Sequence, residues 1–219
     1  MSDLDRFLDS QVELIEADWD PDAHPRGPDG KFTDGIPDVP DLPDTDPVSG
    51  SIDMELGDRN NLEDYMAGSH LRVNKDLRSG DLSDTAERIS ESVNRGIDQA
   101  GEFDETTVYR GIEAPEELTE QIEEGSRMRL NGFQSASHNP DTAANFASSP
   151  DWAESREDVL MVINTTRGLP TYNVEDLGAS TDEQELILGD GWEYEVDTVD
   201  DDGEVKRVEM NLIGGDSDV

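Results

Sequence analysis

The sequence predicts an α+β fold, because helical patterns come first along the chain and strand patterns follow them. In segments 61–80 and 83–101 apolar residues recur every three or four positions, a spacing typical of helices with one buried face. From about residue 106 onward, apolar residues alternate with polar ones or form short runs, which is typical of strands. Helices followed by mostly antiparallel strands make an α+β arrangement.

The first 48 residues differ in composition from the rest of the chain. Residues 1–19 predict an amphipathic helix, whose apolar face would consist of Leu4, Phe7, Leu8, Val12, Ile15 and Trp19. Residues 20–48 hold seven of the eleven prolines and predict an extended linker. We therefore expect three parts, 1–19, 20–48 and a globular domain over 49–219, in which the first helix is a docking peptide, a lid or a loosely attached arm.

The globular part predicts two helices, then strands. The helix over 83–101 carries Ala86, Ile89, Val93 and Ile97 on one stripe. A short helix over 140–149 is expected to begin at Asn139-Pro140, since proline suits the first turn of a helix. Strands are predicted over 106–112, 127–133, 158–166, 185–188, 192–199 and 204–213.

The charge of the chain is strongly negative and spread along its length. Asp and Glu number 55 against 16 Lys and Arg, giving a formal net charge of −39, and lysine occurs only at Lys31, Lys75 and Lys206. Such a charge repels itself at ordinary ionic strength, but at 1 M salt the Debye length falls to about 3 Å. The pattern resembles proteins of salt-accumulating haloarchaea. A DNA mimic or a binder of basic proteins is the rival interpretation, and no clustered acidic face supports it.

Several classes of function are disfavoured by composition. The chain has no basic patch for phosphate contacts, which argues against a nucleic-acid partner. It has no cysteine, so it forms no disulfide and has no thiolate metal site or cysteine nucleophile. It shows no run of 18 apolar residues and no signal-peptide pattern at its start, so we expect a cytoplasmic protein without a membrane partner.

Arg110 lies inside the apolar stretch "VYRGI", where a charge is costly without an anionic partner. A surface carboxylate could be that partner, as happens for many arginines at strand ends. The alternative is a phosphate, because the planar guanidinium donors match phosphate oxygens well.

Ser135 and Ser137 occur in "GFQSASHNPDTAANFA", at the end of a strand and directly before a helix. Either Ser137 or Asn139 could cap that helix. Taken alone, Ser135 carries no functional information.

Glu183 and Glu185 precede the apolar run Leu186, Ile187 and Leu188. A second Glu-x-Glu pair, Glu193 and Glu195, lies in "WEYEV", where alternation places both side chains on one solvated strand face. The first pair differs because Glu185 begins a core strand and Glu183 lies on the loop before it.

In combination these residues resemble the arginine–serine–glutamate class of mono-ADP-ribosyltransferases, a family of bacterial toxins, vertebrate ecto-enzymes and phage-encoded transferases. The resemblance covers residues 52–213, including Asn74, Leu77 and Arg78 in the leading helices. The motifs are Tyr109-Arg110-Gly111, Gly132-Phe133-x-Ser135-Ala136-Ser137 and Glu183-x-Glu185. Ala136 departs from the family pattern, which has a hydroxyl there. The resemblance implies an ADP-ribosyltransferase fold with N-terminal helices followed by a mostly antiparallel two-sheet β core.

The resemblance also implies a reaction, in which the nicotinamide–ribose bond of NAD is broken and ADP-ribose passes to an acceptor. Glu185 is expected to stabilise the positive charge that develops on the ribose, as in glycoside hydrolysis. Ser135 is expected to hold Glu185 in its productive rotamer. Glu183 is expected to orient an arginine acceptor and relieve it of a proton, since guanidinium is a poor nucleophile.

Five residues are expected to bind NAD. Arg110 would hold a phosphate and Gly111 would let its backbone approach the nicotinamide amide. Ser135 and Ser137 are the third and fourth expected NAD-binding residues. Phe146 would pack beside the nicotinamide, although it could equally be helix core. NAD acts here as a substrate, and no metal is expected because His24, His70 and His138 are scattered. We expect no catalytic role for His138.

The alternatives are an NAD glycohydrolase, in which water accepts the ADP-ribose, and a catalytically silent virion-associated or docking protein. Residues 22–35, "DAHPRGPDGKFTDG", resemble a segment of phage capsid-associated and head-morphogenesis polypeptides. That resemblance keeps virion association and delivery to a host cell open beside a cytoplasmic location. The target protein is not identified by the sequence.

Overall fold

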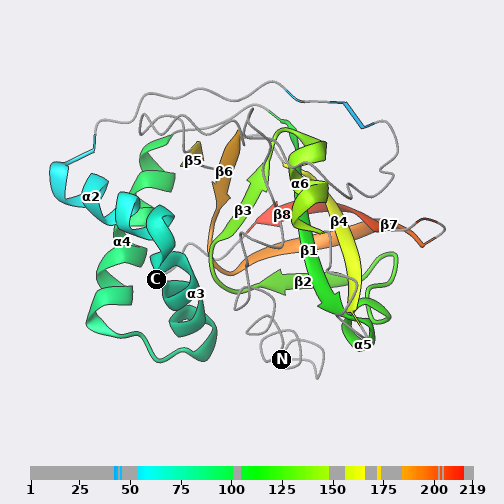
Figure 1. Ribbon diagram of the computed structural model, residues 1–219, viewed down its shortest axis with the longest axis horizontal. Coiled ribbons are helices and arrows are strands. Elements are labelled where there is room, and N and C mark those ends of the chain that lie inside the picture. Colours follow the sequence, from blue (N-terminus) through cyan, green and yellow to red (C-terminus); the bar gives the residue numbers. More distant parts are fainter. Residues whose placement is uncertain are drawn as a thin grey trace.

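The computed structural model (Figure 1) describes residues 42–43, 45, 54–100, 105–147, 156–165, 172–173, 184–201, 203 and 205–214. The predicted helix over 1–19 lies outside the described residues, as do residues 22–35 and all of the predicted linker except 42, 43 and 45. The helices are α2 (Leu56–Asp64), η2 (Tyr65–Ser69), α3 (His70–Ser79), α4 (Asp84–Ala100), α5 (Glu116–Thr119) and α6 (Pro140–Phe146). The strands are β1 (Thr107–Pro115), β2 (Arg127–Leu130), β3 (Gln134–Ser137), β4 (Arg156–Asn164), β5 (Tyr172–Asn173), β6 (Glu185–Leu188), β7 (Trp192–Asp200) and β8 (Lys206–Gly214).

The leading helices form a layer beside β3 and β6 (Figure 1). The first of the two predicted helices is divided into α2 and α3 by the π-helical segment η2, in which Gly68 has a φ of 123°, a conformation that favours glycine. The predicted stripe of α4 is confirmed, because Ala86, Ile89, Val93 and Ile97 are all buried in the main core. The helical layer therefore packs through α4 onto the sheet.

Ser83 caps the N-terminus of α4. Ser83 Oγ accepts a hydrogen bond from the Ala86 amide at 3.4 Å, and donates one to Asp76 at 2.7 Å. Asp84 is already the first helical residue. The cap thus ties the start of α4 to the end of α3.

The strands form a single eight-stranded sheet in the order β2-β7-β8-β4-β1-β3-β6-β5. The expectation of two sheets was therefore wrong. The expectation of mostly antiparallel pairing is confirmed for every pair except β4 and β8, which are parallel. Alternation identifies which face of a strand is buried, but it does not say which strand lies beside it.

The two halves of this sheet meet at one place, which we call the sheet joint. On one side are the strands from β2 to β1, and on the other side are β3, β6 and β5. Across the joint, β1 and β3 share a single registered pair, Tyr109 with Ser137, whereas β1 and β4 share nine, from Thr107 with Asn164 to Pro115 with Arg156. The sheet is therefore continuous, but its two halves are joined by little backbone pairing.

The short helix α6 covers β1 on the face opposite the main core, as Figure 1 shows. Asn139 Oδ1 accepts a hydrogen bond from the Thr142 amide at 3.0 Å and caps the helix, as one of the two predicted caps. A second, smaller core forms beneath α6 from Tyr109, Ala143, Leu160 and Val162. None of the helices in the described part of the chain has the length and apolar character needed to cross a membrane.

Candidate active site

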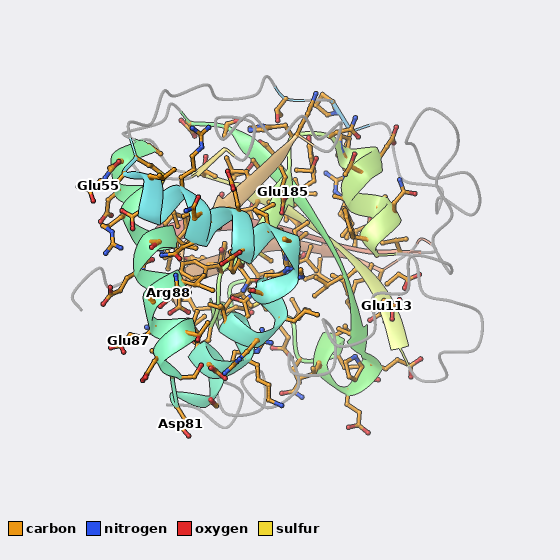
Figure 2. The ribbon with its side chains drawn as sticks, turned by 60° about the vertical axis from the view of Figure 1, so that its left-hand side comes forward. Glu55, Asp81, Glu87, Arg88, Glu113 and Glu185 are labelled. Atoms are coloured by element: carbon orange, nitrogen blue, oxygen red, sulfur yellow. The ribbon has the colours of Figure 1, made fainter. Side chains whose placement is uncertain are left out.

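The sheet joint brings three of the predicted site residues onto neighbouring strands. Ser137 at the end of β3 pairs with Tyr109 of β1 on one side and with Glu185 of β6 on the other. Arg110 directly follows Tyr109 on β1. Figure 2 shows Glu185 in the interior of the fold between the helical layer and α6, whereas Glu113 lies at the other end of β1. Residues far apart in the sequence are thus assembled at one point.

Arg110 is half-buried and bonds across the joint. Its Nη1 donates a hydrogen bond to the carbonyl oxygen of Ser135 at 2.6 Å. A bond from a charged donor is shorter and stronger than one between neutral groups. The guanidinium is therefore held at the joint by β3, in an orientation fixed by the backbone of the serine motif.

The two serines of the motif differ in their surroundings. Ser135 is exposed, and it pairs with Ile187 of β6. Ser137 is buried, and its Oγ accepts a hydrogen bond from the Asn139 amide at 3.0 Å, which shapes the turn into α6. The register places Ser137 directly opposite Glu185 and Ser135 diagonally from Glu185. A side chain as long as that of glutamate can still reach a residue in the diagonal position.

Glu185 is the first residue of β6 and is partly buried, followed by three fully buried residues. This agrees with its predicted place at the start of a core strand. Gln184, just before it, has a φ of 48°, in the left-handed region that non-glycine residues rarely adopt. Glu183 lies outside the described residues, so its role remains a prediction.

Gly111 lies where α6 crosses β1. A Cβ atom at this position would be 1.8 Å from the carbonyl oxygen of Ala143 and 2.6 Å from the amide nitrogen of Ala147. Glycine is thus required here for the helix to approach the strand. This packing role stands independently of the predicted contact with nicotinamide.

Phe146 is the last residue of α6 and remains 37% exposed. Phe146 is therefore not a fully buried residue of the helix core, and its binding role remains a prediction. The second Glu-x-Glu pair is on β7, away from the joint. Glu193 there is exposed and Glu195 bonds to exposed Arg127 at 3.3 Å, which confirms that this pair lies on a solvated face.

The turn before β3 is held by two polar residues. Asn74 of α3, buried, accepts from the Phe133 amide at 2.9 Å and donates to the Phe133 carbonyl at 3.0 Å. Asp190 accepts from the Gly132 amide at 2.5 Å, and burial raises the pKa of this carboxyl although backbone amides and nearby arginines oppose the shift. The serine strand is thus anchored where it begins.

Asp190 was not identified from the sequence. The stretch Gly189-Asp190-Gly191 reads as a turn, and this was the only available signal. Nothing in it indicates that the carboxylate reaches Gly132, 58 positions earlier in the chain.

Replacing Asn74 by alanine is expected to lower the free energy of unfolding by about 2 to 3 kcal/mol, because the buried amide and carbonyl of Phe133 lose their partners. Urea unfolding followed by circular dichroism measures the change. Asn94→Ala, on the exposed face of α4, is the matched control and is expected to change stability by less than about 0.5 kcal/mol. Equal stability of the two variants would contradict the anchoring role.

A sequence model described as ADP-ribosyltransferase exoenzyme matches residues 53–213. A search of curated protein sequences found no match.

Solved structures of bacterial toxins share the fold. The Vis toxin, an ADP-ribosyltransferase from Vibrio splendidus, superposes with a TM-score of 0.61 at 18% identity, covering 74% of this chain and 75% of that chain. Exoenzyme S from Pseudomonas aeruginosa, in complex with human 14-3-3 protein beta and bound to Carba-NAD, has a TM-score of 0.57 at 17% identity, covering 72% and 74%. C3stau2 from S. aureus with NAD has a TM-score of 0.55 at 17% identity, covering 74% and 89%.

Proposed function

The chain belongs to the ADP-ribosyltransferase exoenzyme family, and from this premise we propose that it transfers ADP-ribose from NAD to arginine side chains of a protein. NAD is the substrate of the family, and it supplies the ADP-ribose while nicotinamide leaves. The observation that carries the proposal is the row of Glu185, Ser137 and Tyr109 across the sheet joint, with Arg110 next to Tyr109 and bonded to the Ser135 carbonyl. We propose the arginine acceptor, the role of each site residue and the high-salt setting.

The residues at the joint have the chemistry that NAD requires. Arg110 presents a cation with several N–H donors to a pyrophosphate, which matters in a chain whose net charge of −39 otherwise repels an anion. The exposed ring of Phe146 offers an apolar surface to nicotinamide, and Gly111 would contact it through backbone groups alone, because α6 occupies the place of a side chain there. Ser135 and Ser137 add hydroxyl groups between the two ends. These groups are compatible with NAD along its length.

Glu185 supplies the negative charge that favours cleavage of the bond to nicotinamide. A carboxylate fixed near the ribose stabilises positive charge as it develops there, and it costs no reorganisation if it is already in place. Its position at the start of a buried strand limits its movement, because Leu186, Ile187 and Leu188 are fully buried. Ser135 supports the rotamer of Glu185 from the diagonal position.

Glu183 selects arginine as the acceptor in this proposal. The guanidinium nitrogen forms the new bond to the ribose carbon, and its proton passes to the Glu183 carboxylate. The sequence spacing Glu183-x-Glu185 supports this assignment. A further support is the crystal structure of the similar Vis toxin in complex with agmatine, a compound that ends in a guanidinium group.

The proposed setting is a high-salt cytoplasm. At 1 M salt the self-repulsion of the acidic surface is screened within about 3 Å, so the fold tolerates its charge. Virion association, or delivery to a host cell, is the alternative setting that residues 22–35 leave open. In the proposed organisation, residues 1–19 and 20–48 precede a transferase domain over 49–219.

The test is nicotinamide release from NAD in 1 M potassium chloride, with and without agmatine. We expect agmatine to increase the release and to gain the mass of ADP-ribose. Glu183→Gln is expected to lower the rate of agmatine-dependent transfer at least about tenfold, since it removes the base. Slow hydrolysis of NAD is expected to continue in this variant. Asp141→Asn, at an exposed position of α6, is the control for removing one charge.

Three results would contradict the proposal. Release that agmatine does not change would indicate an NAD glycohydrolase. Full agmatine transfer by Glu183→Gln would remove the proposed role of Glu183. A folded protein that neither binds NAD nor releases nicotinamide would favour the docking protein.

A further inference from the structure

Three residues that precede the helical layer bridge the sheet joint. We call Leu42, Pro43 and Thr45 the clasp; it is drawn in blue at the top of Figure 1. On the β1 side, Thr45 Oγ1 donates to the Thr107 carbonyl at 2.8 Å. On the β3 side, the Thr45 amide donates to the carbonyl of His138 at 3.1 Å. Thr45 therefore contacts both halves of the sheet.

The clasp has two further contacts with the β1 side. The Tyr109 hydroxyl donates to the carbonyl oxygen of Pro43 at 2.8 Å. Leu42 packs against the small core that contains Tyr109, Ala143 and Leu160. These contacts are to residues beside the predicted site, because Tyr109 precedes Arg110 and His138 follows Ser137.

Backbone pairing across the joint is sparse, and the clasp adds links there beside the packing of α6, which follows β3 in the chain and lies on β1. The ladder there is a single pair, Tyr109 with Ser137, and the bond from Arg110 to the Ser135 carbonyl is a second link. Within the smaller half, by contrast, β3 and β6 share four registered pairs. The relative placement of Arg110 and Glu185 depends on this joint.

The side chain of His138 is fully buried and held by Thr45. Its Nδ1 is 2.8 Å from Thr45 Oγ1. Because the single hydroxyl proton of Thr45 goes to the Thr107 carbonyl, we assign the hydrogen in the contact to Nδ1, which donates to Oγ1. Burial lowers the pKa of His138, in keeping with a neutral ring. Among the described residues, Nε2 has no hydrogen-bond partner, so the contact with Thr45 is the one hydrogen bond that orients the ring there.

His138 in turn holds the residue before Glu185. Its amide donates to the Gln184 carbonyl at 3.2 Å, which extends the pairing of β3 and β6 beyond Ser137 and Glu185. Gln184 adopts its φ of 48° at a cost of about 1 to 2 kcal/mol. A conformation of this kind persists only where neighbouring contacts maintain it.

We propose that Thr45 and His138 are positioning residues, which hold the Gln184–Glu185 turn against the strand of Arg110. The clasp thereby sets the separation between the phosphate-binding arginine and the catalytic carboxylate. The inference rests on the proposed function, since it assigns Arg110 and Glu185 their roles in it. Neither Thr45 nor His138 contacts the substrate in this proposal.

The first measurement is kcat and KM for nicotinamide release in 1 M potassium chloride. Thr45→Val keeps the shape of the side chain and removes its hydroxyl. We expect kcat to fall about tenfold, because small misplacements of a catalytic group slow the reaction. We expect KM for NAD to change less than about twofold. Thr45→Ser and His138→Asn keep the hydroxyl and the Nδ1-like donor, and both are expected to retain kcat within about twofold of the wild type.

Thr119→Val is the matched control. Like the hydroxyl of half-buried Thr45, the hydroxyl of buried Thr119 donates to a backbone carbonyl, that of Glu116 at 3.0 Å in α5, beyond the other end of β1. A kcat for Thr45→Val equal to that of Thr119→Val, with both variants folded and the wild type active, would overturn the positioning role and leave the proposed function standing.

The second measurement does not need turnover. Hydrogen exchange of the His138 amide reports the bond to Gln184, and we expect it to be at least about tenfold faster in Thr45→Val than in Thr119→Val. Unchanged exchange would overturn the inference. If the wild type releases no nicotinamide, the proposed function fails, and this exchange ratio decides by itself whether Thr45 holds the turn.

Discussion

Replacing Glu185 by glutamine is expected to slow nicotinamide release from NAD by about 10²- to 10³-fold, with the fold intact. Glutamine has nearly the same size and retains hydrogen bonding, but it removes the negative charge that stabilises the developing positive charge on the ribose. Loss of one preorganised electrostatic group in an active site has an effect of this order. Steady-state release of nicotinamide, at saturating NAD in 1 M potassium chloride, measures it.

Glu193→Gln is the control for this prediction. It makes the same chemical change in the other Glu-x-Glu pair, at an exposed position of β7 outside the joint. We expect the control to keep wild-type activity, and both variants to give the wild-type circular dichroism spectrum. A folded Glu185→Gln that retained a tenth or more of the wild-type rate would show that the catalytic carboxylate lies elsewhere.

Replacing Gly111 by alanine is expected to lower the free energy of unfolding by about 3 kcal/mol or more. The added methyl group would lie 1.8 Å from the Ala143 carbonyl oxygen, and this neighbour is helix backbone, which cannot rotate away as a side chain can. Helix α6 would have to move off β1 and open the small core under it, a cost at the upper end of that found for overpacked sites. Urea or thermal unfolding measures the loss.

Gly57→Ala is the matched control for the glycine prediction. A methyl group at Gly57 in α2 meets no atom within 4 Å, and alanine is the better helix former, so we expect stability to be unchanged or raised by up to about 1 kcal/mol. If Gly111→Ala unfolded like the wild type but bound NAD more weakly, the packing role would be wrong and the predicted contact with nicotinamide would be supported.

The sequence predicted the family but not how the candidate site residues are arranged. The order of Arg110, Ser135 and Glu185 along the chain sufficed for the family, which the match over residues 53–213 shows. It did not indicate that Ser137, rather than Ser135, lies opposite Glu185. That relation is a matter of register, and a shift of two residues, which keeps each side chain on its face of the sheet, would place Ser135 opposite Glu185 instead.

The contacts of the clasp were also not predicted from the sequence. Residues 20–48 predict a linker because they contain too little apolar material for a core, yet Leu42, Pro43 and Thr45 of that segment contact the folded domain. Their contacts are mostly hydrogen bonds to backbone carbonyls. Backbone groups are present at every position, so no pattern of residues predicts such a contact.

By itself the sequence determined the order of the helices and most of the strands, their buried faces and the set of motif residues. These follow from local periodicity and from residue chemistry, which are properties of neighbouring positions. Only the tertiary structure decided that the strands form one sheet, that β8 lies parallel to β4, and that β1 and β3 meet at a single pair beside Arg110 and Glu185. Strand partners are chosen by the packing of the whole domain, because any exposed strand edge offers the same backbone donors and acceptors to every other strand.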